Sequence, residues 1–337
     1  MHGCACLGES VSASTTIYSG WTWDEVVGSA ALAAALIKKG KRVFIEFPSP
    51  QEVKSLIISG AYTIGISHRE GAILRNTTAI KFFNDKKLGI IFRYDGSGRS
   101  EIIMKFANVR SITETVLEYI LTLNEKINVP EQLLNDIVSM NELRLDRLSR
   151  VGKIMYKALK MNYNNKEFRR EMYNFALNAI KTKSLKLPEP VIREATKFDE
   201  ALKIAGKLVR EEHYIKYNTI PLLVVSTKFD DEFIKENFSL LKPIAYDLLL
   251  KLCRSNGLGM LVLETDLGHT LRICLHKKDL SFVKIISSIP RELSEKLLIS
   301  LRGNHIIIKY KNPSESNLDN VLSLVNKITA SILESKQ

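Results

Sequence analysis

The first third of the chain alternates short β-branched or aromatic runs with longer amphipathic stretches. Apolar residues in short runs predict strands, and apolar residues at helical spacing predict helices between them. The strands are expected over residues 15–19, 41–47, 61–67, 78–83, 87–94 and 101–107, and the helices over 24–39, 51–59 and 111–124. Alternation of this kind predicts a mostly parallel sheet with helices on both faces.

Local signals mark the ends of two of these helices. Asp24 is a candidate N-cap for the first helix, and Gly40 follows its last turn. Ser111, with Glu114 three residues later, has the spacing of a capping box at the start of the third helix. Both helices therefore have defined starts.

The strand signal disappears between residues 130 and 217. Apolar residues recur here at helical spacing, and the segment 181–190 separates two helical parts. The clearest repeat is formed by Leu148, Val151, Met155 and Leu159. A helical connector is expected.

The last third returns to mixed strands and helices. A strand is expected over 221–227, helices over 234–254 with a break near Pro243, and a hairpin formed by 259–265 and 269–276. A helix over 291–301, a strand over 304–310 and a helix over 317–335 follow. We therefore predict an α/β protein, with α/β domains over 1–128 and 218–337 joined by the connector over 129–217.

Charge is distributed unevenly along the 337 residues. The net charge of +12 divides into +1 for residues 1–140, +8 for 141–216 and +3 for 217–337. A basic excess in one region can indicate contact with phosphates or with an acidic protein partner. A solvated, lysine-rich helical surface gives the same pattern, so both interpretations stay open.

The number of cysteines and the hydropathy of the chain indicate in which cellular compartment the protein is expected. Cys4, Cys6, Cys253 and Cys274 lack zinc-ribbon spacing, although the C-x-C pair could bind a metal or become oxidised. So few cysteines favour a reducing, intracellular setting. The apolar run over 28–37 is shorter than the ~20 residues of a membrane span, and the first residues do not resemble a secretion signal. We expect a cytoplasmic protein without membrane contact.

Ligands in open α/β sheets bind where the parallel strands end. Three such ends read "SGWTWDE", "ISHREG" and "FRYDGSG". None is a glycine-rich phosphate loop, and the glycines at 96 and 98 lie between two strands rather than before a helix. A dinucleotide site is therefore not expected.

The order of elements resembles the DHH phosphoesterase family, which includes the RecJ exonucleases. The small-residue helix of the first motif is present as residues 28–32, "GSAAL". The family's His-x-Asp-x-Asp-Gly turn is not present. Aligning it puts Gly20 at the histidine, Thr22 and Asp24 at the two aspartates, and Glu25 at the glycine.

The other motifs of the family also fall on changed residues. Ser67 stands at the aspartate of the second motif, and the third motif, Asp-His-His, falls on Arg93, Tyr94 and Asp95. The fourth motif matches the start of the helix over 111–124. The resemblance continues into a DHH-associated domain, where a Gly-Gly-His turn and a basic strand residue correspond to Gly303, Asn304, His305 and Arg272.

These departures imply that the family's two-manganese site is lost. Such a site needs several carboxylates and imidazoles, whereas Thr22, Ser67 and Arg93 stand at acidic positions. An arginine ~4 Å from a divalent cation adds roughly 8 kcal/mol of repulsion at an effective dielectric constant of ~20. A one-residue shift would make Asp95 a ligand, but it restores no His-x-Asp-x-Asp sequence. We expect no metal and no cofactor.

Several of these residues also have ordinary structural interpretations. Asp24 fits a helix N-cap, while His68 and Arg69 fit a loop. His269 and His276 flank one strand without a third ligand. Of Trp21 and Trp23, one is expected to pack into the sheet and the other to face the cleft, where it could stack on a base or anchor a protein.

A DHH scaffold without its metal ligands resembles the archaeal RecJ-like replication proteins that are counterparts of the CDC45 subunit of the replicative helicase. The resemblance implies a nucleoid-associated, non-catalytic subunit of the CMG helicase that binds the GINS complex and stimulates unwinding by MCM. Alternatives are a manganese-dependent single-strand 5′ exonuclease or phosphodiesterase, and a stand-alone DNA-binding module. Candidate contacts with single-stranded DNA are Trp21, Arg169, Arg170 and Arg272.

Overall fold

The computed structural model describes residues 14–67, 71–142, 144–162, 165–210, 215–217, 220–225, 244–250, 253–254, 257–265, 268–275, 282–302 and 305–334. The chain divides into two compact units, and the division falls between Ala195 and Thr196. This point lies inside helix α7 (Glu189–Arg210). The two units are described separately below. The domain bounds at residues 128 and 217 stay predictions.

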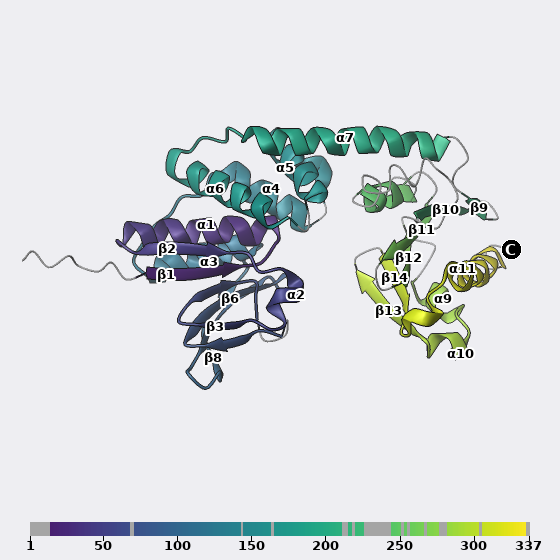
Figure 1. Ribbon diagram of the computed structural model, residues 1–337, viewed down its shortest axis with the longest axis horizontal. Coiled ribbons are helices and arrows are strands. Elements are labelled where there is room, and N and C mark those ends of the chain that lie inside the picture. Colours follow the sequence, from purple (N-terminus) through teal and green to yellow (C-terminus); the bar gives the residue numbers. More distant parts are fainter. Residues whose placement is uncertain are drawn as a thin grey trace, which may run out of the picture. The chain divides into compact units, whose positions relative to one another are not determined.

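The first unit is built on a six-stranded sheet in the order β2-β1-β4-β6-β7-β8 (Figure 1). Its strands are β1 (Ser14–Ser19), β2 (Arg42–Glu46), β4 (Tyr62–Ile64), β6 (Thr77–Phe83), β7 (Leu88–Tyr94) and β8 (Ser100–Ala107). The pairs β1–β2, β1–β4 and β4–β6 are parallel. The pairs β6–β7 and β7–β8 are antiparallel. The α/β class and the parallel-rich sheet are as predicted.

One face of this sheet packs against helices. Ile17, Ile64, Ile80 and Ile91 point into a core formed with α1 (Trp23–Lys38) and α3 (Ile112–Thr122). Because α1 is rich in alanine, it can be buried almost completely and approach α3 closely. A Cβ on Gly28 would already lie 3.4 Å from a methyl group of Val116.

The opposite face is covered without long helices, which corrects the expectation of helices on both faces. Its core joins α2 (Pro50–Val53) to a two-stranded parallel sheet of β3 (Ile57–Ser59) and β5 (Ile73–Arg75). The predicted helix over 51–59 is therefore only one turn long. Its second half, with Ile57 and Ile58, pairs with β5 instead, as suits β-branched residues.

The helices of the middle region are α4 (Glu131–Asn141), α5 (Arg150–Met161) and α6 (Lys166–Thr182), followed by α7. The predicted repeat at 148–159 forms α5, with Met155 fully buried. Residues of α4, α5 and α6 share one core with α1 and α3. These helices are thus packed onto the first sheet's helical layer.

The second unit contains a sheet in the order β13-β14-β12-β11-β10-β9. The pair β10–β11 is parallel and the other pairs are antiparallel. The strands are β9 (Ile215–Tyr217), β10 (Ile220–Val225), β11 (Leu258–Thr265), β12 (Gly268–Leu275), β13 (Leu297–Arg302) and β14 (His305–Tyr310). The β11–β12 hairpin confirms the prediction for this segment.

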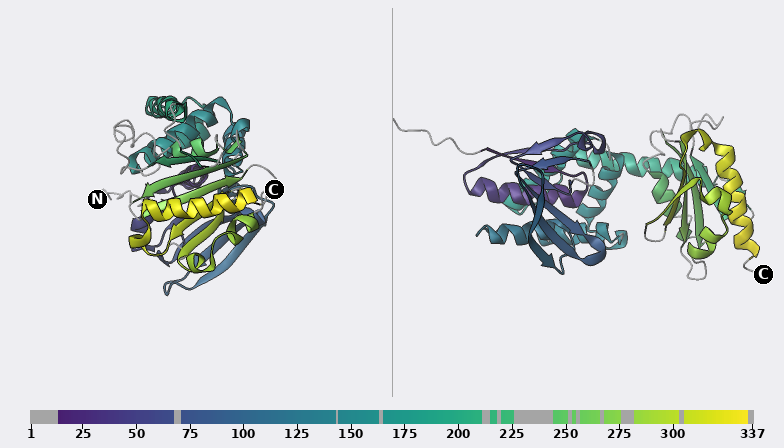
Figure 2. Two further views of the ribbon diagram at one scale, coloured as in Figure 1. Left: turned by 90° about the vertical axis from the view of Figure 1, so that its right-hand side faces the viewer. Right: turned by 90° about the horizontal axis from the view of Figure 1, so that it is seen from below.

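Helices α9 (Phe282–Ser287) and α11 (Leu318–Glu334) cover one face of this second sheet. In the right-hand view of Figure 2, α11 (yellow) runs alongside the strands of this sheet. The other face packs against the helical residues 244–250. No described helix is both long and apolar enough to cross a membrane.

Two expectations for the second unit are wrong. The helix over 291–301 is limited to the single turn α10 (Arg291–Ser294), because Leu297, Leu298 and Ile299 pair with β14 as an edge strand. Strand β9 falls inside the region expected to be wholly helical. The first part of the expected helix over 234–254 lies outside the described residues.

Candidate functional site

The expected site is the corner where β1 passes into α1. Thr22 is the N-cap of α1, since its Oγ1 accepts a hydrogen bond from Glu25 N at 3.2 Å and its own N–H donates to Glu25 Oε2 at 2.8 Å. This reciprocal pair is a capping box. The prediction that Asp24 is the N-cap is therefore wrong by two positions.

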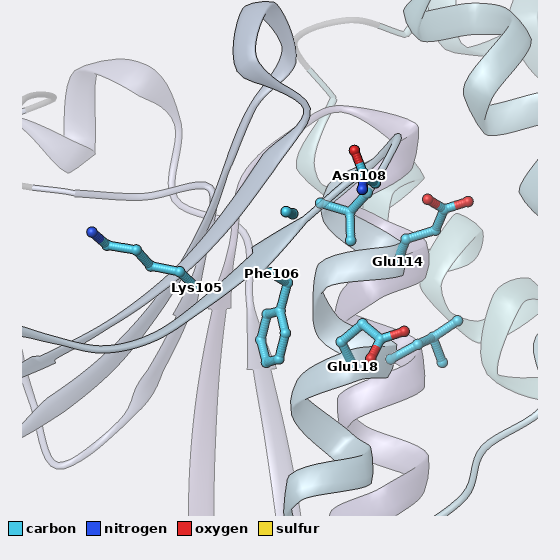
Figure 3. Close-up of a pocket in the computed structure, with 8 residues that line it drawn as sticks. Lys105, Phe106, Asn108, Glu114 and Glu118 are labelled. Atoms are coloured by element: carbon cyan, nitrogen blue, oxygen red, sulfur yellow. The ribbon is translucent and has the colours of Figure 1, made fainter.

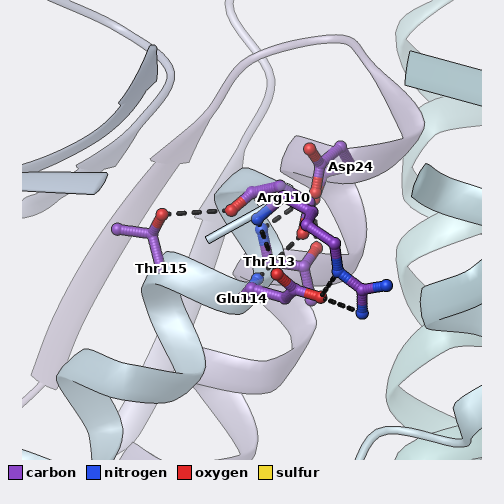
Figure 4. A network of polar contacts seen from close by, with 6 residues as sticks. Asp24, Arg110, Thr113, Glu114 and Thr115 are labelled. Carbon is purple, nitrogen blue, oxygen red and sulfur yellow. Dashed lines mark hydrogen bonds and ion pairs between the residues drawn. The ribbon is translucent and has the colours of Figure 1, made fainter. Parts of the chain in front are cut away.

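Asp24 instead caps a different helix (Figure 4). Its side chain is 5% exposed. Oδ2 accepts hydrogen bonds from Ile112 N at 2.9 Å and Asn141 Nδ2 at 2.8 Å, and Oδ1 accepts one from Thr113 N at 2.8 Å. Ser111 Oγ accepts from Glu114 N at 3.0 Å, which confirms Ser111 as the N-cap of α3.

The Asp24 carboxylate thus binds three donors from two helices. Burial raises its pKa above the usual value, and the hydrogen bonds from Thr113, Asn141 and Ile112 oppose that rise. Thr113 Oγ1 also donates to the Asp24 carbonyl at 2.8 Å. Asp24 therefore joins α1, α3 and α4, and both of its carboxylate oxygens are engaged by protein donors.

Glu25 lies across the carboxyl ends of β1 and β4. A Cβ on Gly20 would lie 2.3 Å from Glu25 Oε2, and one on Gly65 would lie 2.0 Å from Oε1. The two glycines leave the space that this carboxylate occupies, and Gly65 also has a φ of +80°. The glutamate fills the place between the strand ends where a ligand would approach the sheet.

Two cationic side chains complete the corner. Lys81 on β6 donates a hydrogen bond to Ser67 Oγ, so an ammonium lies beside the residue that the sequence comparison aligns with the aspartate of the second motif. Arg169 on α6 is 3% exposed and donates from Nε to Trp21 O at 2.8 Å and from Nη1 to Asn162 O at 3.1 Å. Sequence reasoning overlooked Lys81.

The Arg169 guanidinium is held inside the protein by its surroundings. It lies over the Trp21 ring, 5.3 Å from the centroid. Burial lowers its pKa to about 10, and the charge of Glu25 acts in the opposite direction. It therefore carries its charge at neutral pH. This burial corrects the expectation that Arg169 contacts nucleic acid.

The two tryptophans have other surroundings than expected. Trp23 is buried and stacks on Phe175 of α6 at 6.2 Å between ring centroids, so it packs between helices rather than into the sheet. Trp21 is half-buried, and its Nε1 donates to Pro48 O at 2.6 Å. Arg170, the residue after Arg169 on α6, is partly exposed. Its guanidinium pairs with the carboxylates of Glu167 at 3.1 Å and Glu46 at 3.8 Å.

The residues aligned with the third motif lie at the other edge of the sheet. Tyr94 pairs with Thr77 at the start of β6, whereas Ser67 follows the end of β4, which is parallel to β6. The expectation that Arg93, Tyr94 and Asp95 join Thr22 and Ser67 in one former metal site is therefore wrong. A one-residue shift does not change this.

Each of these three residues has a local role. Arg93 is exposed and lies 3.9 Å from Glu101. Tyr94 is buried in the core of the second face. Asp95 shapes the β7–β8 turn, since its Oδ1 accepts hydrogen bonds from Ser97 N, Ser97 Oγ and Arg99 N at 2.8, 2.7 and 3.0 Å.

The second unit gathers another polar cluster, on the face of its sheet that packs against residues 244–250. Tyr246 Oη lies 2.9 Å from His305 Nε2, and the Arg272 guanidinium lies 5.7 Å from the centre of the Tyr246 ring. Burial, and then the charge of Arg272, lower the pKa of His305. The structure thus brings Arg272 and His305 together around Tyr246.

Other candidates do not add a metal centre. Among the described residues, no group of three or more histidine, cysteine or acidic side chains could hold a metal ion. His269 is buried, with Nδ1 2.8 Å from Ser316 O. Cys253 and Cys274 are buried neighbours whose thiols share a hydrogen bond. His68, Arg69, His276, Gly303, Asn304, Cys4 and Cys6 lie outside the described residues.

A cavity of about 570 Å³ lies between the end of β8 and α3 (Figure 3). Glu114 and Glu118 lie one helical turn apart on α3 beside it, and Phe106 also lines it. Glu114 is already paired with Arg110, whose Nη2 lies 2.6 Å from Glu114 Oε1. None of the residues that line this cavity stands at the ends of β1 and β4.

No family model and no curated protein matches the chain. Among solved structures, RecJ from Thermus thermophilus in complex with Mn²⁺ is similar, with a TM-score of 0.46 and 10% identity over 94% of this chain and 51% of RecJ. An exopolyphosphatase-related protein from Bacteroides fragilis has a TM-score of 0.44 and 10% identity, over 95% of this chain and 93% of that protein. CDC45 from Entamoeba histolytica has a TM-score of 0.44 and 9% identity, over 95% of each chain.

The similar structures thus include RecJ and CDC45, the proteins to which the sequence resemblance points. The chain spans about half the length of the Thermus RecJ. Identities of 9% and 10% with TM-scores below 0.5 carry no metal, activity or partner over to this chain. Function therefore depends on the residues of the corner and of the second cluster.

Proposed function

We propose that this chain is a non-catalytic, DHH-type subunit of a CMG-type replicative helicase, and that it acts at the nucleoid. In this role it binds the GINS complex and stimulates DNA unwinding by the MCM ring. The proposal takes its partners from the sequence resemblance and its non-catalytic character from the chemistry of the corner.

The observation that carries the non-catalytic character is the pair of cations at the carboxyl ends of the parallel strands. Lys81 hydrogen-bonds Ser67, and Arg169 is buried beside Trp21 and Glu25. A divalent ion ~4 Å from either cation meets roughly 8 kcal/mol of repulsion at an effective dielectric constant of ~20. Glu25 and Asp24 are carboxylates of this corner, and both already accept hydrogen bonds within the protein.

Co-purification tests the proposed partners. The tagged full-length chain is expressed in its native cells and captured with and without nuclease treatment, so that bridging by DNA is removed. We expect GINS subunits to be retained after nuclease treatment, and MCM to be retained together with them. Loss of GINS from nuclease-treated samples would overturn the helicase-subunit proposal.

The two alternative functions give different results in simple assays. A RecJ-type exonuclease or phosphodiesterase removes 5′ nucleotides from labelled single-stranded DNA in Mn²⁺. A stand-alone DNA-binding module binds DNA in a salt-dependent way but retains no GINS. The proposed subunit cleaves no DNA in Mn²⁺ and retains GINS in the co-purification.

A further inference from the structure

A row of basic side chains follows the chain from the end of α4 along the whole of α5. Arg144, Arg147, Arg150, Lys153, Lys157 and Lys160 recur at intervals of three or four residues. Glu142 and Asp146 are the acidic residues of the same stretch. This segment therefore holds much of the basic excess of the middle region.

Helix α5 presents its part of the row on one side. Its buried residues are Gly152, Met155 and Ala158. Positions 150, 153, 157 and 160 fall in an arc of about 80° that is centred opposite these buried residues, and they extend over about 15 Å along the axis. The helix contains no acidic residue. Arg150 and Lys153 are exposed.

The row begins at an arginine-lined cavity. Arg110, Arg144 and Arg147 line a cavity of about 340 Å³ together with one carboxylate, Glu142, so its lining carries a net positive charge. The three arginines come from the segment before α3, the end of α4 and the 3₁₀ turn η3 (Leu145–Arg147). Arg147 also lines the adjoining cavity that reaches Ser149 at the start of α5. Glu131 and Asp136 line that second cavity too, so the cationic row continues along the outer side of α5 rather than through it.

Part of this charge is not neutralised within the protein. Arg110 pairs with Glu114 at 2.6 Å and Arg144 with Glu142 at 3.2 Å. Arg147, Arg150 and Lys153 have no carboxylate partner in the part of the chain that the structure describes. Guanidinium groups bind phosphate oxygens in a bidentate way, and a row of cations matches a repeating anion.

The surroundings favour nucleic acid over an acidic protein. Protein interfaces depend on large apolar or aromatic anchors. Among the described residues of 141–162, no large hydrophobic side chain is exposed. The exposed surface of this segment is instead cationic, which suits a phosphodiester backbone read without sequence preference.

We infer that the Arg110–Arg144–Arg147 cavity and the basic row of α5 form a binding track for the phosphodiester backbone of nucleic acid. The track lies outside the corner at the ends of β1 and β4. It requires neither a metal nor GINS, and so it does not depend on the proposed helicase role.

Fluorescence anisotropy with the full-length chain tests this track. The probes are a labelled 20-nucleotide oligo-dT and a 20-base-pair duplex, each titrated at several KCl concentrations. The test variant is Arg147→Ala with Lys153→Ala. The matched control is Arg75→Ala with Lys86→Ala, which removes the same charge from exposed sites on β5 and the β6–β7 turn.

The test variant is expected to bind oligo-dT on the order of tenfold more weakly, with a salt slope smaller by about 1.4, or about 0.7 for each lost phosphate contact. The control keeps the wild-type slope. If both variants lost the same affinity for oligo-dT, net charge alone would explain the effect and the inference would be overturned. The inference would also be overturned if unlabelled poly-glutamate displaced the probe as effectively as unlabelled oligo-dT of equal total charge. The surface would then not distinguish nucleic acid from an acidic protein.

Discussion

The corner of the first unit and the polar cluster of the second unit differ in how their polar groups are used. In the corner, Asp24 caps α3, Glu25 caps the start of α1, and Arg169 donates to two backbone carbonyls. In the second cluster, His305 hydrogen-bonds Tyr246 through Nε2, while its buried Nδ1 has no partner among the described residues.

The corner uses its charged groups to join secondary-structure elements, whereas the second cluster holds a buried histidine with one unpartnered ring nitrogen among the described residues. Each charged group of the corner holds secondary structure together, so removing it should cost stability. In the second cluster, besides burial, the charge of Arg272 lies close enough to lower the pKa of His305, so changing His305 should alter protonation more than folding. The following substitutions test that contrast.

The largest effect is expected for Asp24→Ala. The substitution leaves the N–H groups of Ile112 and Thr113 and the Asn141 amide without their acceptor, and hydrogen bonds to buried charged groups are worth about 1.5–3 kcal/mol each. We expect the free energy of unfolding of the first unit to fall by about 3–5 kcal/mol. Urea denaturation followed by tryptophan fluorescence measures it, since Trp21 and Trp23 are the only tryptophans.

Asp24→Asn is the control for this change. The amide keeps the shape and one acceptor oxygen, so the loss should be clearly smaller than for the alanine variant. If Asp24→Ala unfolds at the same urea concentration as the wild type, Asp24 does not hold α1, α3 and α4 together.

A smaller, pH-dependent effect is expected for His305→Gln. The folded pKa of His305 lies below its ordinary value of ~6.5 because of burial and Arg272. Acidification therefore protonates the unfolded chain first, and the stability of the second unit falls as pH decreases through the folded pKa. Urea unfolding followed by circular dichroism between pH 7.5 and 5 should show a shallower loss in the variant. Parallel curves would contradict the assignment.

The smallest effect is expected for Arg93→Ala. This side chain is exposed, and its contact with Glu101 is an exposed ion pair of the kind that contributes less than about 1 kcal/mol. We expect a change of under ~0.5 kcal/mol in the free energy of unfolding and no change in the response to Mn²⁺. If Arg93→Ala changed the effect of Mn²⁺ on the free energy of unfolding, Arg93 would have to lie near the corner, which would contradict the strand order.

Much of the architecture could be predicted from local patterns. The strands of the first sheet, the capped start of α3, the β11–β12 hairpin and the terminal helix follow from apolar periodicity and capping residues. The errors occur where pairing decides between alternatives. Residues 57–58 and 297–299 are apolar enough for a helix or a strand, and only a partner strand selects the strand.

The site was harder to predict because it depends on strand direction. Strands β6 and β7 are joined only by the turn η2 (Asn84–Lys86) and Lys87. This connection is too short for a parallel crossover, which needs a dozen or more residues. That signal was available in the sequence and would have placed Arg93–Asp95 at the opposite edge. The capping of α3 by Asp24, 88 residues away, has no local signal.

The central claim is that the protein's own charges exclude divalent metal ions from this corner. Electron paramagnetic resonance of free Mn²⁺, titrated with the full-length chain, tests it directly, with 5′-labelled single-stranded DNA added to follow cleavage. We predict that the free Mn²⁺ signal and the DNA both remain unchanged. Stoichiometric loss of the signal together with release of 5′ nucleotides, both abolished by Glu25→Gln, would contradict the account.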